Sequence, residues 1–531
     1  MNAWRPKSHS AAPAAEDEID DMPWKYRVAL LLAACCYLYL QTFILPCVPI
    51  SQGDNTHFFL LDGARMLRGE VLYRDFQELT FPGMEALTFL LLKSFGMRAW
   101  IPAATLICVG ALLTLLGVMI TSKVLSGPSV FLPAVAYLTL AFGNALDDTH
   151  HWFSILACLA AVAVLLDNSR PTRVAWAGGL CGIACCFTQS RGALAMLALT
   201  AFFAWESHAR KLGPRCWIVR VAILGAAYAA AALAFNTYFI CKAGWSNFYY
   251  CTFTFLARYY GAFHRNNLSV YMVDLPDFAQ VLLSIPSLGV WLFIHLVAPL
   301  VNLLFLVRWW RMRQEISPTL SRRLMLINMM GLAFFLSIAS APQWFRVASA
   351  TLPALILLVW ILNAPGRLHQ FARQALWVFS LATGIGAAVI TQSSAMGPLE
   401  TPTGRVEVLS SDRYEKYHWL IPRVQAGQYI LDAGNGEAYF FLELQDPAPV
   451  SFLTDSAFTR PGQVDALLNK MAQTRVEYII WPVELDQPPP GNRGSDALRP
   501  LRAYMRKQYR VVKVFTNGDQ VWQKHDGADQ P

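Results

Sequence analysis

The chain has 531 residues, of which 55% are hydrophobic and only 15% are charged. Soluble globular proteins contain about 25% charged residues, so this composition excludes an ordinary soluble protein and indicates a membrane protein. The formal net charge is +8. Lys and Arg stand between apolar segments, which is typical of membrane topology signals rather than of a nucleic-acid-binding face. None of the 11 cysteines follows Cys251, so no disulfide framework is predicted for the C-terminal part.

The N-terminal part begins with a polar tail. Residues 1–24 carry an acidic run and are predicted to form a disordered cytoplasmic tail. The apolar segment at 27–48 is too long for the core of a signal peptide and is predicted to be an uncleaved anchor helix. The segment 84–95 is shorter and amphipathic, which is typical of a helix that lies at the membrane surface.

Further apolar segments follow along the chain. Together with the anchor they predict about eleven transmembrane helices by length and hydropathy. Their approximate bounds are 100–121, 129–146, 152–167, 174–190, 192–206, 217–240, 281–307, 324–341, 344–362 and 374–391.

The positive charges indicate the orientation of these helices. Lys and Arg concentrate in alternate connecting loops, and such loops face the cytoplasm. The N-terminus is therefore predicted to be cytoplasmic. The segments predicted to lie outside are 51–83, 147–151, 241–280 and 392–531, whereas the positive loops contain Lys123, Arg170, Arg173, Arg210, Lys211, Arg215, Arg308, Arg311, Arg313, Arg322, Arg323, Arg367 and Arg373.

The composition changes at about residue 395 to that of a soluble α/β protein. A helix is predicted over 464–473, and strands over 427–431, 449–453 and 476–480. Asn517-Gly518 predicts a hairpin between 509–515 and 520–523. The predicted organisation is therefore a tail (1–24), a membrane domain (25–394) with an outer loop (49–99), and a periplasmic α/β domain (395–531).

One polar stretch, Ser51 to Gly83, separates the first two apolar segments and reads SQGDNTHFFLLDGARMLRGEVLYRDFQELTFPG. It resembles the first outer loop of GT-C-type, polyprenyl-phosphate-sugar-dependent membrane glycosyltransferases, such as protein mannosyltransferases and lipid A aminoarabinose transferases. These carry an acidic pair, a Tyr-Arg-Asp-Phe segment and a Pro-Pro-Gly break. The pair here is Asp54-Asn55, and Phe81 stands for the first Pro. Residues 344–355 show a weaker resemblance to the family.

The resemblance implies an α-helical polytopic enzyme of the bacterial inner membrane with a GT-C-like fold. Such an enzyme moves a sugar, with inversion, from a polyprenyl-phosphate-linked donor to an acceptor at the periplasmic face. The acceptor is lipid A or its core, a glycan or a protein, and no nucleic acid is involved. Two other classes stay open from the residues alone. A secondary transporter would explain the many spans, and a non-catalytic scaffold of envelope glycan assembly would explain the outer domain.

The resemblance also implies roles for three residues. Asp54 is the candidate general base that takes the proton of the acceptor hydroxyl, although an acid before an apolar-periodic segment is also typical of a helix N-cap. Arg346 and Arg191 are candidates for holding the donor phosphate, because a guanidinium binds phosphate with two parallel hydrogen bonds. The alternatives are an interfacial anchor at Arg346 and a solvated loop residue at Arg191.

Two further groups are candidates for other roles. The stretch Asp147, Asp148, His150 and His151 corresponds to a second acidic motif of the family. These side chains could contact donor or acceptor, form a capped turn, or hold a divalent cation, which is the one cofactor left open. Adjacent residues of a helix point in different directions, so all four cannot converge on one ion. Tyr73, Arg74 and Asp75 are expected to fix the shape of the outer loop.

Overall fold

The computed structural model describes residues 23–268, 289–434, 436–487 and 496–525. Within these ranges, only the backbone of Asp54 is described and not its side chain. The predicted tail over 1–24 therefore lies almost entirely outside the described residues. The helices of the first part are α1 (Trp24–Thr42), α2 (Asp54–Leu67), α3 (Gly83–Phe95), α4 (Ile101–Thr121), α5 (Leu132–Ala136), α6 (His150–Leu165), α7 (Pro171–Phe187), α8 (Gln189–Ala209), α9 (Pro214–Ala243), α10 (Trp245–Tyr249), α11 (Leu256–Tyr259), α14 (Ala298–Met312), α15 (Pro318–Ile338), α16 (Trp344–Ser349), α17 (Leu352–Leu362) and α18 (Arg367–Ser393).

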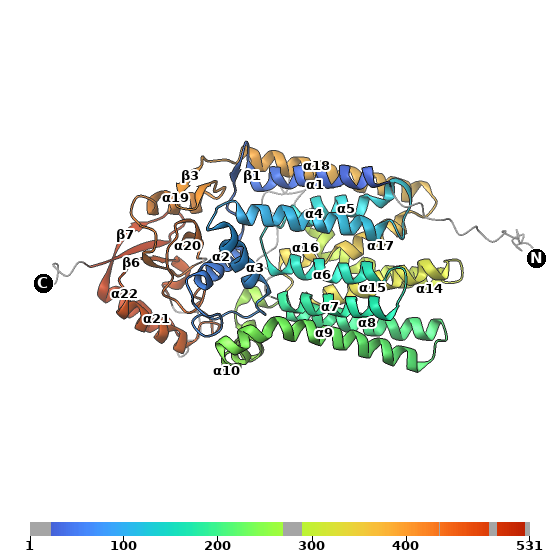
Figure 1. Ribbon diagram of the computed structural model, residues 1–531. Coiled ribbons are helices and arrows are strands. Elements are labelled where there is room, and N and C mark those ends of the chain that lie inside the picture. Colours follow the sequence, from blue (N-terminus) through green and yellow to red (C-terminus); the bar gives the residue numbers. More distant parts are fainter. Residues whose placement is uncertain (1–22, 269–288, 435, 488–495, 526–531) are drawn as a thin grey trace, which may run out of the picture.

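Most of these helices run side by side in one bundle (Figure 1). Among the described residues, five helices are long and apolar enough to cross a membrane, namely Ile101–Thr121, Pro214–Ala243, Gly289–Met312, Pro318–Ile338 and Arg367–Ser393. Shorter apolar helices occupy Gly127–Phe142, His150–Leu165 and Leu352–Leu362. The chain is therefore a mostly helical protein with membrane-spanning helices.

Two of the predicted spans are interrupted. The first helix ends at Thr42, and the chain continues in a short hairpin of β1 (Phe43–Ile44) and β2 (Val48–Pro49). The span predicted over 344–362 is divided into α16 and α17. Pro353 stands in the first turn of α17, where the missing N–H of proline is tolerated, whereas an uninterrupted helix would need that donor.

Close contact between helices depends on small residues. The helix α7 packs against α6 and α9. A Cβ atom at Gly178 would lie 2.3 Å from the carbonyl oxygen of Leu224, and one at Gly182 would lie 2.5 Å from that of Tyr228. Glycine is therefore required for the backbones of α7 and α9 to approach this closely, as at interfaces between membrane helices.

Several positive loops meet at one end of the bundle. The Asp167 carboxylate lies 3.6 Å from Lys123, 3.3 Å from Arg173 and 3.5 Å from Arg323. At the same end of the bundle, Glu206 pairs with Arg322 and with Arg210. The loops that the positive-charge pattern assigns to one side thus come together in the structure.

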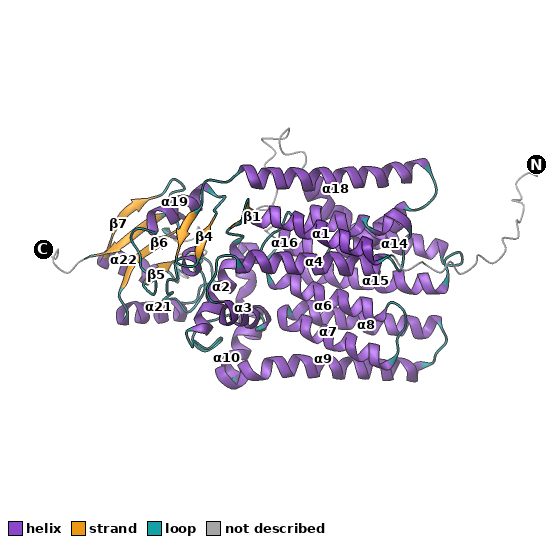
Figure 2. Cartoon of the chain, turned by 45° about the horizontal axis from the view of Figure 1, so that its top comes forward, coloured by secondary structure: helices purple, strands orange, loops and turns teal. Residues whose placement is uncertain are grey.

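A mixed sheet lies beyond the opposite end of the bundle (Figure 2). Its strand order is β5-β6-β8-β7, with β5 parallel to β6 and the other neighbours antiparallel. The strands and helices of this part are β3 (Leu399–Thr401), β4 (Gly404–Val406), α19 (Ser411–Leu420), β5 (Tyr429–Asp432), α20 (Glu437–Phe441), α21 (Pro461–Gln473), β6 (Val476–Trp481), α22 (Arg499–Gln508), β7 (Tyr509–Val514) and β8 (Gln520–Lys524). The helix and hairpin predicted over 464–473 and 509–523 are present.

The strand predicted over 449–453 is wrong. These residues form no strand, because their backbone binds other parts of the chain. The carbonyl oxygen of Pro449 accepts from the backbone N–H of Gln77 at 2.8 Å, and the N–H of Leu453 donates to Ala433 at 3.2 Å. Pro449 also has no N–H to offer a neighbouring strand.

The outer loop and the C-terminal part share one apolar core. Leu60, Leu61 and Ala64 of α2 pack in the same buried cluster as Ile430 and Tyr439. The backbone N–H of Ser51 also donates to the carbonyl oxygen of Glu407 at 2.8 Å. The helices α2 and α3 consequently lie between the bundle and the sheet (Figure 1), and the candidate site forms at this junction.

Candidate active site

The start of α2 is held by a carboxylate from a distant part of the chain. Asp147 Oδ1 accepts hydrogen bonds from the backbone N–H and from the hydroxyl of Thr56, each at 2.9 Å. Its Oδ2 accepts from the side-chain amide of Asn55. A carboxylate that receives the free N–H groups of a helix start stabilises that helix. Asp147 therefore caps α2 in place of a local residue, since Gly53 precedes the helix.

Gly53 allows the start of α2 to approach the segment that contains Asp147. A Cβ atom at position 53 would lie 3.0 Å from Cγ of Asp147. The side chain of Asp54, the predicted base, lies outside the described part of the structure. Its backbone begins α2, between Gly53 and the Asn55 that Asp147 holds. Asp147 thus positions the segment that carries Asp54.

Asp148 and His151 of the second acidic motif are buried near this contact, and His150 is half-buried. The N–H of Asp148 donates to the hydroxyl of Thr56 at 2.8 Å, and Thr149 caps α6 through His151. Burial, and secondarily the nearby Asp147, raises the pKa of Asp148 well above its ordinary value. The rings of His150 and His151 lie 4.1 Å apart, centre to centre. Among the described residues, these four side chains do not gather into one metal-ligating group.

Arg346 stands in the short helix α16 at the same end of the bundle. Its side chain is half-buried, and its guanidinium lies over the rings of Phe345 and Tyr260 at 5.5 Å and 6.0 Å from their centres. Its Nη1 makes a 3.4 Å hydrogen bond to the carbonyl oxygen of Ala341. Among the described residues, no carboxylate pairs with Arg346. Its guanidinium therefore has donors left, within this part of the chain, for an anionic ligand.

Arg191 is fully buried at the start of α8. Its Nη1 donates to the carbonyl oxygen of His151 at 3.0 Å and to Ser154 Oγ at 3.1 Å, and its Nη2 donates to Ser349 Oγ at 3.1 Å. The residue thus joins α6, α8 and α16, the helix that carries Arg346. Sequence reasoning placed it in a loop, but it begins a helix in the interior.

A cavity of about 980 Å³ opens where the bundle meets the sheet. Asn55, Asp147 and Arg346 line it, together with Arg413 and Glu437 of the C-terminal part. Arg413 is paired with Glu437 at 2.8 Å. Of the predicted site residues, the structure therefore brings Asp147 and Arg346 to one cavity beside the start of α2, whereas Arg191, Asp148 and the two histidines do not line it.

Tyr73, Arg74 and Asp75 shape the outer loop. The Asp75 carboxylate accepts from Arg74 at 2.9 Å and 2.8 Å and from the backbone N–H of Val71 at 2.7 Å. The hydrogen bond with Arg74 holds the pKa of Asp75 below its ordinary value. Tyr73 has φ of 69° and donates its hydroxyl to the carbonyl oxygen of Thr80 at 2.6 Å. These contacts make a compact turn between α2 and α3.

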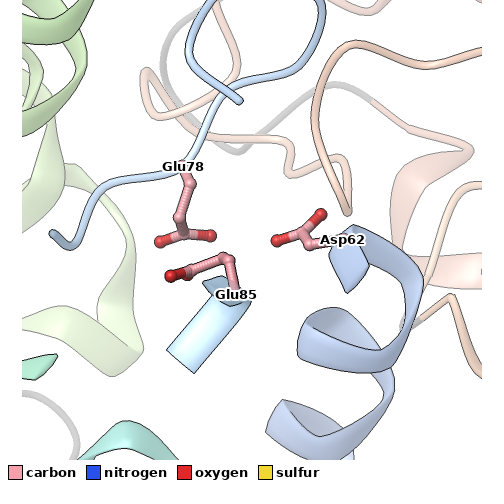
Figure 3. A group of neighbouring side chains, drawn as sticks. All are labelled: Asp62, Glu78 and Glu85. Atoms are coloured by element: carbon pink, nitrogen blue, oxygen red, sulfur yellow. The ribbon is translucent and has the colours of Figure 1, made fainter. Parts of the chain in front are cut away.

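Sequence reasoning missed one group of side chains. Asp62, Glu78 and Glu85 place carboxylate oxygens within 4.8 Å of one another, and two of the three residues are buried (Figure 3). Asp62 lies among the apolar residues of α2 that face the core, and Glu85 lies in the first turn of the mainly apolar α3. Charged residues on a buried helix face were the signal in the sequence that could have found this group.

Comparisons with known proteins place the fold. No family model matches the sequence, and no curated protein matches it either. The structure is similar to that of ArnT from Cupriavidus metallidurans in the apo state, with a TM-score of 0.56, 12% identity, and 96% of this chain and 100% of that chain covered. The structure of ArnT from the same organism bound to undecaprenyl phosphate is also similar, with a TM-score of 0.55, 11% identity, and 96% of this chain and 99% of that chain covered. The chain has the GT-C fold.

A third solved structure is also similar to this chain in fold. It is the oligosaccharyltransferase of Archaeoglobus fulgidus in complex with Zn and sulfate, with a TM-score of 0.51, 11% identity, and 93% of this chain and 73% of that chain covered. At this identity the likeness concerns the fold and not the residues of the site. The GT-C fold predicted from the outer-loop motif is confirmed.

Proposed function

We propose that this protein is an inverting glycosyltransferase of the bacterial inner membrane. It takes a sugar from a polyprenyl-phosphate-linked donor and transfers it to a lipid, glycan or protein acceptor at the periplasmic face. The observation that carries this proposal is the cavity that is lined by the start of α2, Asp147 and Arg346, where no carboxylate of the described residues pairs with Arg346. The ArnT structure with bound undecaprenyl phosphate has this fold and supports a polyprenyl phosphate as the carrier of the sugar.

The proposed reaction is a single displacement. The acceptor oxygen attacks the anomeric carbon, the new glycosidic bond forms, and the bond from that carbon to the phosphate oxygen breaks. Asp54 takes the proton of the attacking hydroxyl. The leaving group is a phosphate that is already ionised, so it departs with the bonding electrons and needs no acid.

Arg346 binds that phosphate and stabilises the charge left on it. Its planar guanidinium is suited to two parallel hydrogen bonds with phosphate oxygens. Arg191 of α8 donates a hydrogen bond to Ser349 of α16, the helix that carries Arg346. Its fixed positive charge adds to the potential that attracts the donor phosphate.

The C-terminal part, 395–531, is proposed to be a periplasmic α/β domain that covers the site and helps to select the acceptor. Lys416 and Arg413 of α19 reach the same cavity as Arg346. Both are paired, Lys416 with Asp519 at 2.7 Å and Arg413 with Glu437. Paired charges at a cavity wall are suited to recognise a polar, hydroxyl-rich acceptor.

The proposed activity can be tested in cells that contain or lack the gene. Mass spectrometry of lipid extracts should show a polyprenyl-phosphate sugar that accumulates without the gene. The envelope glycans or glycoproteins of the same cells should lack one sugar. Restoring the wild-type gene should reverse both changes, and unchanged donor and product pools would exclude the transfer reaction.

The same proposal includes about eleven membrane crossings, with the shorter apolar helices among them. It places the N-terminus in the cytoplasm and the C-terminus in the periplasm, because the positive loops gather at the end of the bundle opposite the C-terminal sheet, and positive loops face the cytoplasm. An alkaline phosphatase fused after Pro531 should be active, and one inserted between Arg210 and Gly213 should be inactive. Green fluorescent protein at these positions should give the opposite pattern. Activity at position 210 alone would reverse the orientation.

A further inference from the structure

Three carboxylates meet between α2, the outer loop and α3. Asp62 comes from α2, Glu78 from the loop and Glu85 from the first turn of α3, and Figure 3 shows the three groups directed toward a common space. Their nearest oxygens all lie within 4.8 Å of one another. None of the three lines the large cavity. Asp62 stands eight positions after Asp54, about 12 Å farther along the helix.

The hydrogen bonds of this group are incomplete. Both side-chain oxygens of Asp62, and Oε2 of Glu85, are buried without a hydrogen-bond partner among the described residues. Asp62 and Glu85 have no exposed surface. Glu78 Oε1 accepts from the backbone N–H groups of Leu79 and Thr80 at 2.6 Å and 3.1 Å. A buried carboxylate oxygen without a donor is costly, so these three oxygens need a cation or a proton as a partner.

The nearest arginine does not supply this partner. Arg65 donates its Nε to Glu70 at 2.9 Å and its Nη1 to the carbonyl oxygen of Ala448 at 2.8 Å, and it lies 3.7 Å from Asp446. Burial, and then the neighbouring Glu78, raises the pKa of both Asp62 and Glu85 well above their ordinary values. The three acids therefore repel one another unless protons or a cation neutralise them.

We propose that Asp62, Glu78 and Glu85 bind a calcium ion that fastens the outer loop to α2 and α3. The donors are oxygen atoms only, which hard cations prefer, and no thiolate or imidazole belongs to the group. Calcium–oxygen distances of about 2.3–2.6 Å allow two ligands of one ion to lie up to about 5 Å apart. The oxygens lie within 4.8 Å of one another, which is compatible with this range. Magnesium usually keeps several waters and is bound by one or two carboxylates, so a buried group of three carboxylates favours calcium.

The bound ion would stabilise a turn that the site depends on. The hydroxyl of Thr80 lies within hydrogen-bond distance of Glu78 and Glu85. The carbonyl oxygen of Thr80 accepts a hydrogen bond from the hydroxyl of Tyr73 at 2.6 Å. Tyr73 has the positive φ that non-glycine residues adopt only when the surroundings hold them. The ion therefore has a structural role, and its binding can be measured whether or not the proposed transfer reaction is correct.

The test uses the full chain in detergent, stripped with a chelator and then dialysed against radioactive calcium. We expect one calcium ion per chain, and a melting temperature at least about 2 °C higher with millimolar calcium than with chelator. The double variant Asp62→Asn, Glu85→Gln should bind no calcium and show no calcium-dependent shift. With chelator it should melt no lower than the wild type, because the amides remove the repulsion between buried acids.

Glu400→Gln is the matched control, since it removes one exposed negative charge outside the group and should leave calcium binding unchanged. Equal melting temperatures of the wild type with calcium and with chelator would mean that protons neutralise the group, and the proposal would be wrong. It would also be wrong if the double variant still bound calcium or if only magnesium stabilised the wild type. If the double variant does not fold, calcium binding by Asp62→Asn alone decides between the same outcomes.

Discussion

Replacing Asp54 by Asn is expected to reduce sugar transfer about 10²–10⁴-fold, the usual contribution of a general base. The amide keeps the size of the side chain but cannot take the proton of the acceptor hydroxyl. Because Asp147 caps the helix through Asn55 and Thr56, α2 should still form in the variant. Initial rates at saturating donor, normalised to folded protein, measure the effect.

Asp75→Asn is the control for Asp54→Asn. It removes a carboxylate of the same outer loop, and Asp75 does not line the cavity. Its loss frees Arg74 and the N–H of Val71. We expect lower yield and a lower melting temperature, with transfer per folded molecule within about tenfold of the wild type. A loss of less than about tenfold for Asp54→Asn would assign that residue to the helix start rather than to catalysis.

Replacing Arg346 by Ala is expected to weaken use of the donor by about 10- to 100-fold, since a hydrogen bond to a charged group contributes about 1.5–3 kcal/mol. Arg346→Lys should be impaired less than Ala, because it keeps the charge but loses the bidentate geometry. The change should appear in kcat/KM for the donor and leave the preference among acceptors unaltered. Rates over a series of donor concentrations measure it.

Arg258→Ala serves as the control for Arg346, because Arg258 is an exposed arginine of the same outer region that does not line the cavity. It should behave like the wild type in donor titration. If Arg346→Ala did so too, Arg346 would be an interfacial anchor. The phosphate would then have to be held elsewhere, and the corresponding variants of Arg191 would be the next to measure.

The local features of this protein were predictable from its sequence. Long apolar segments bounded by Lys and Arg predict membrane helices because hydropathy and length are properties of one segment at a time. The stretch from Ser51 to Gly83 indicated the GT-C fold for the same reason, since its motif is continuous. The helix α3 and the hairpin over 509–523 are where the sequence places them.

Only the tertiary structure decided which distant residues meet. Asp147 caps a helix that begins more than 90 positions earlier, and the strand predicted over 449–453 is replaced by contacts with Gln77 and Ala433. Asp62, Glu78 and Glu85 looked like separate charges of a polar loop until α2 and α3 brought them together. Hydrogen bonds and repulsion between carboxylates depend on distances in space. Those distances follow from how the helices pack, which no single segment of the sequence contains.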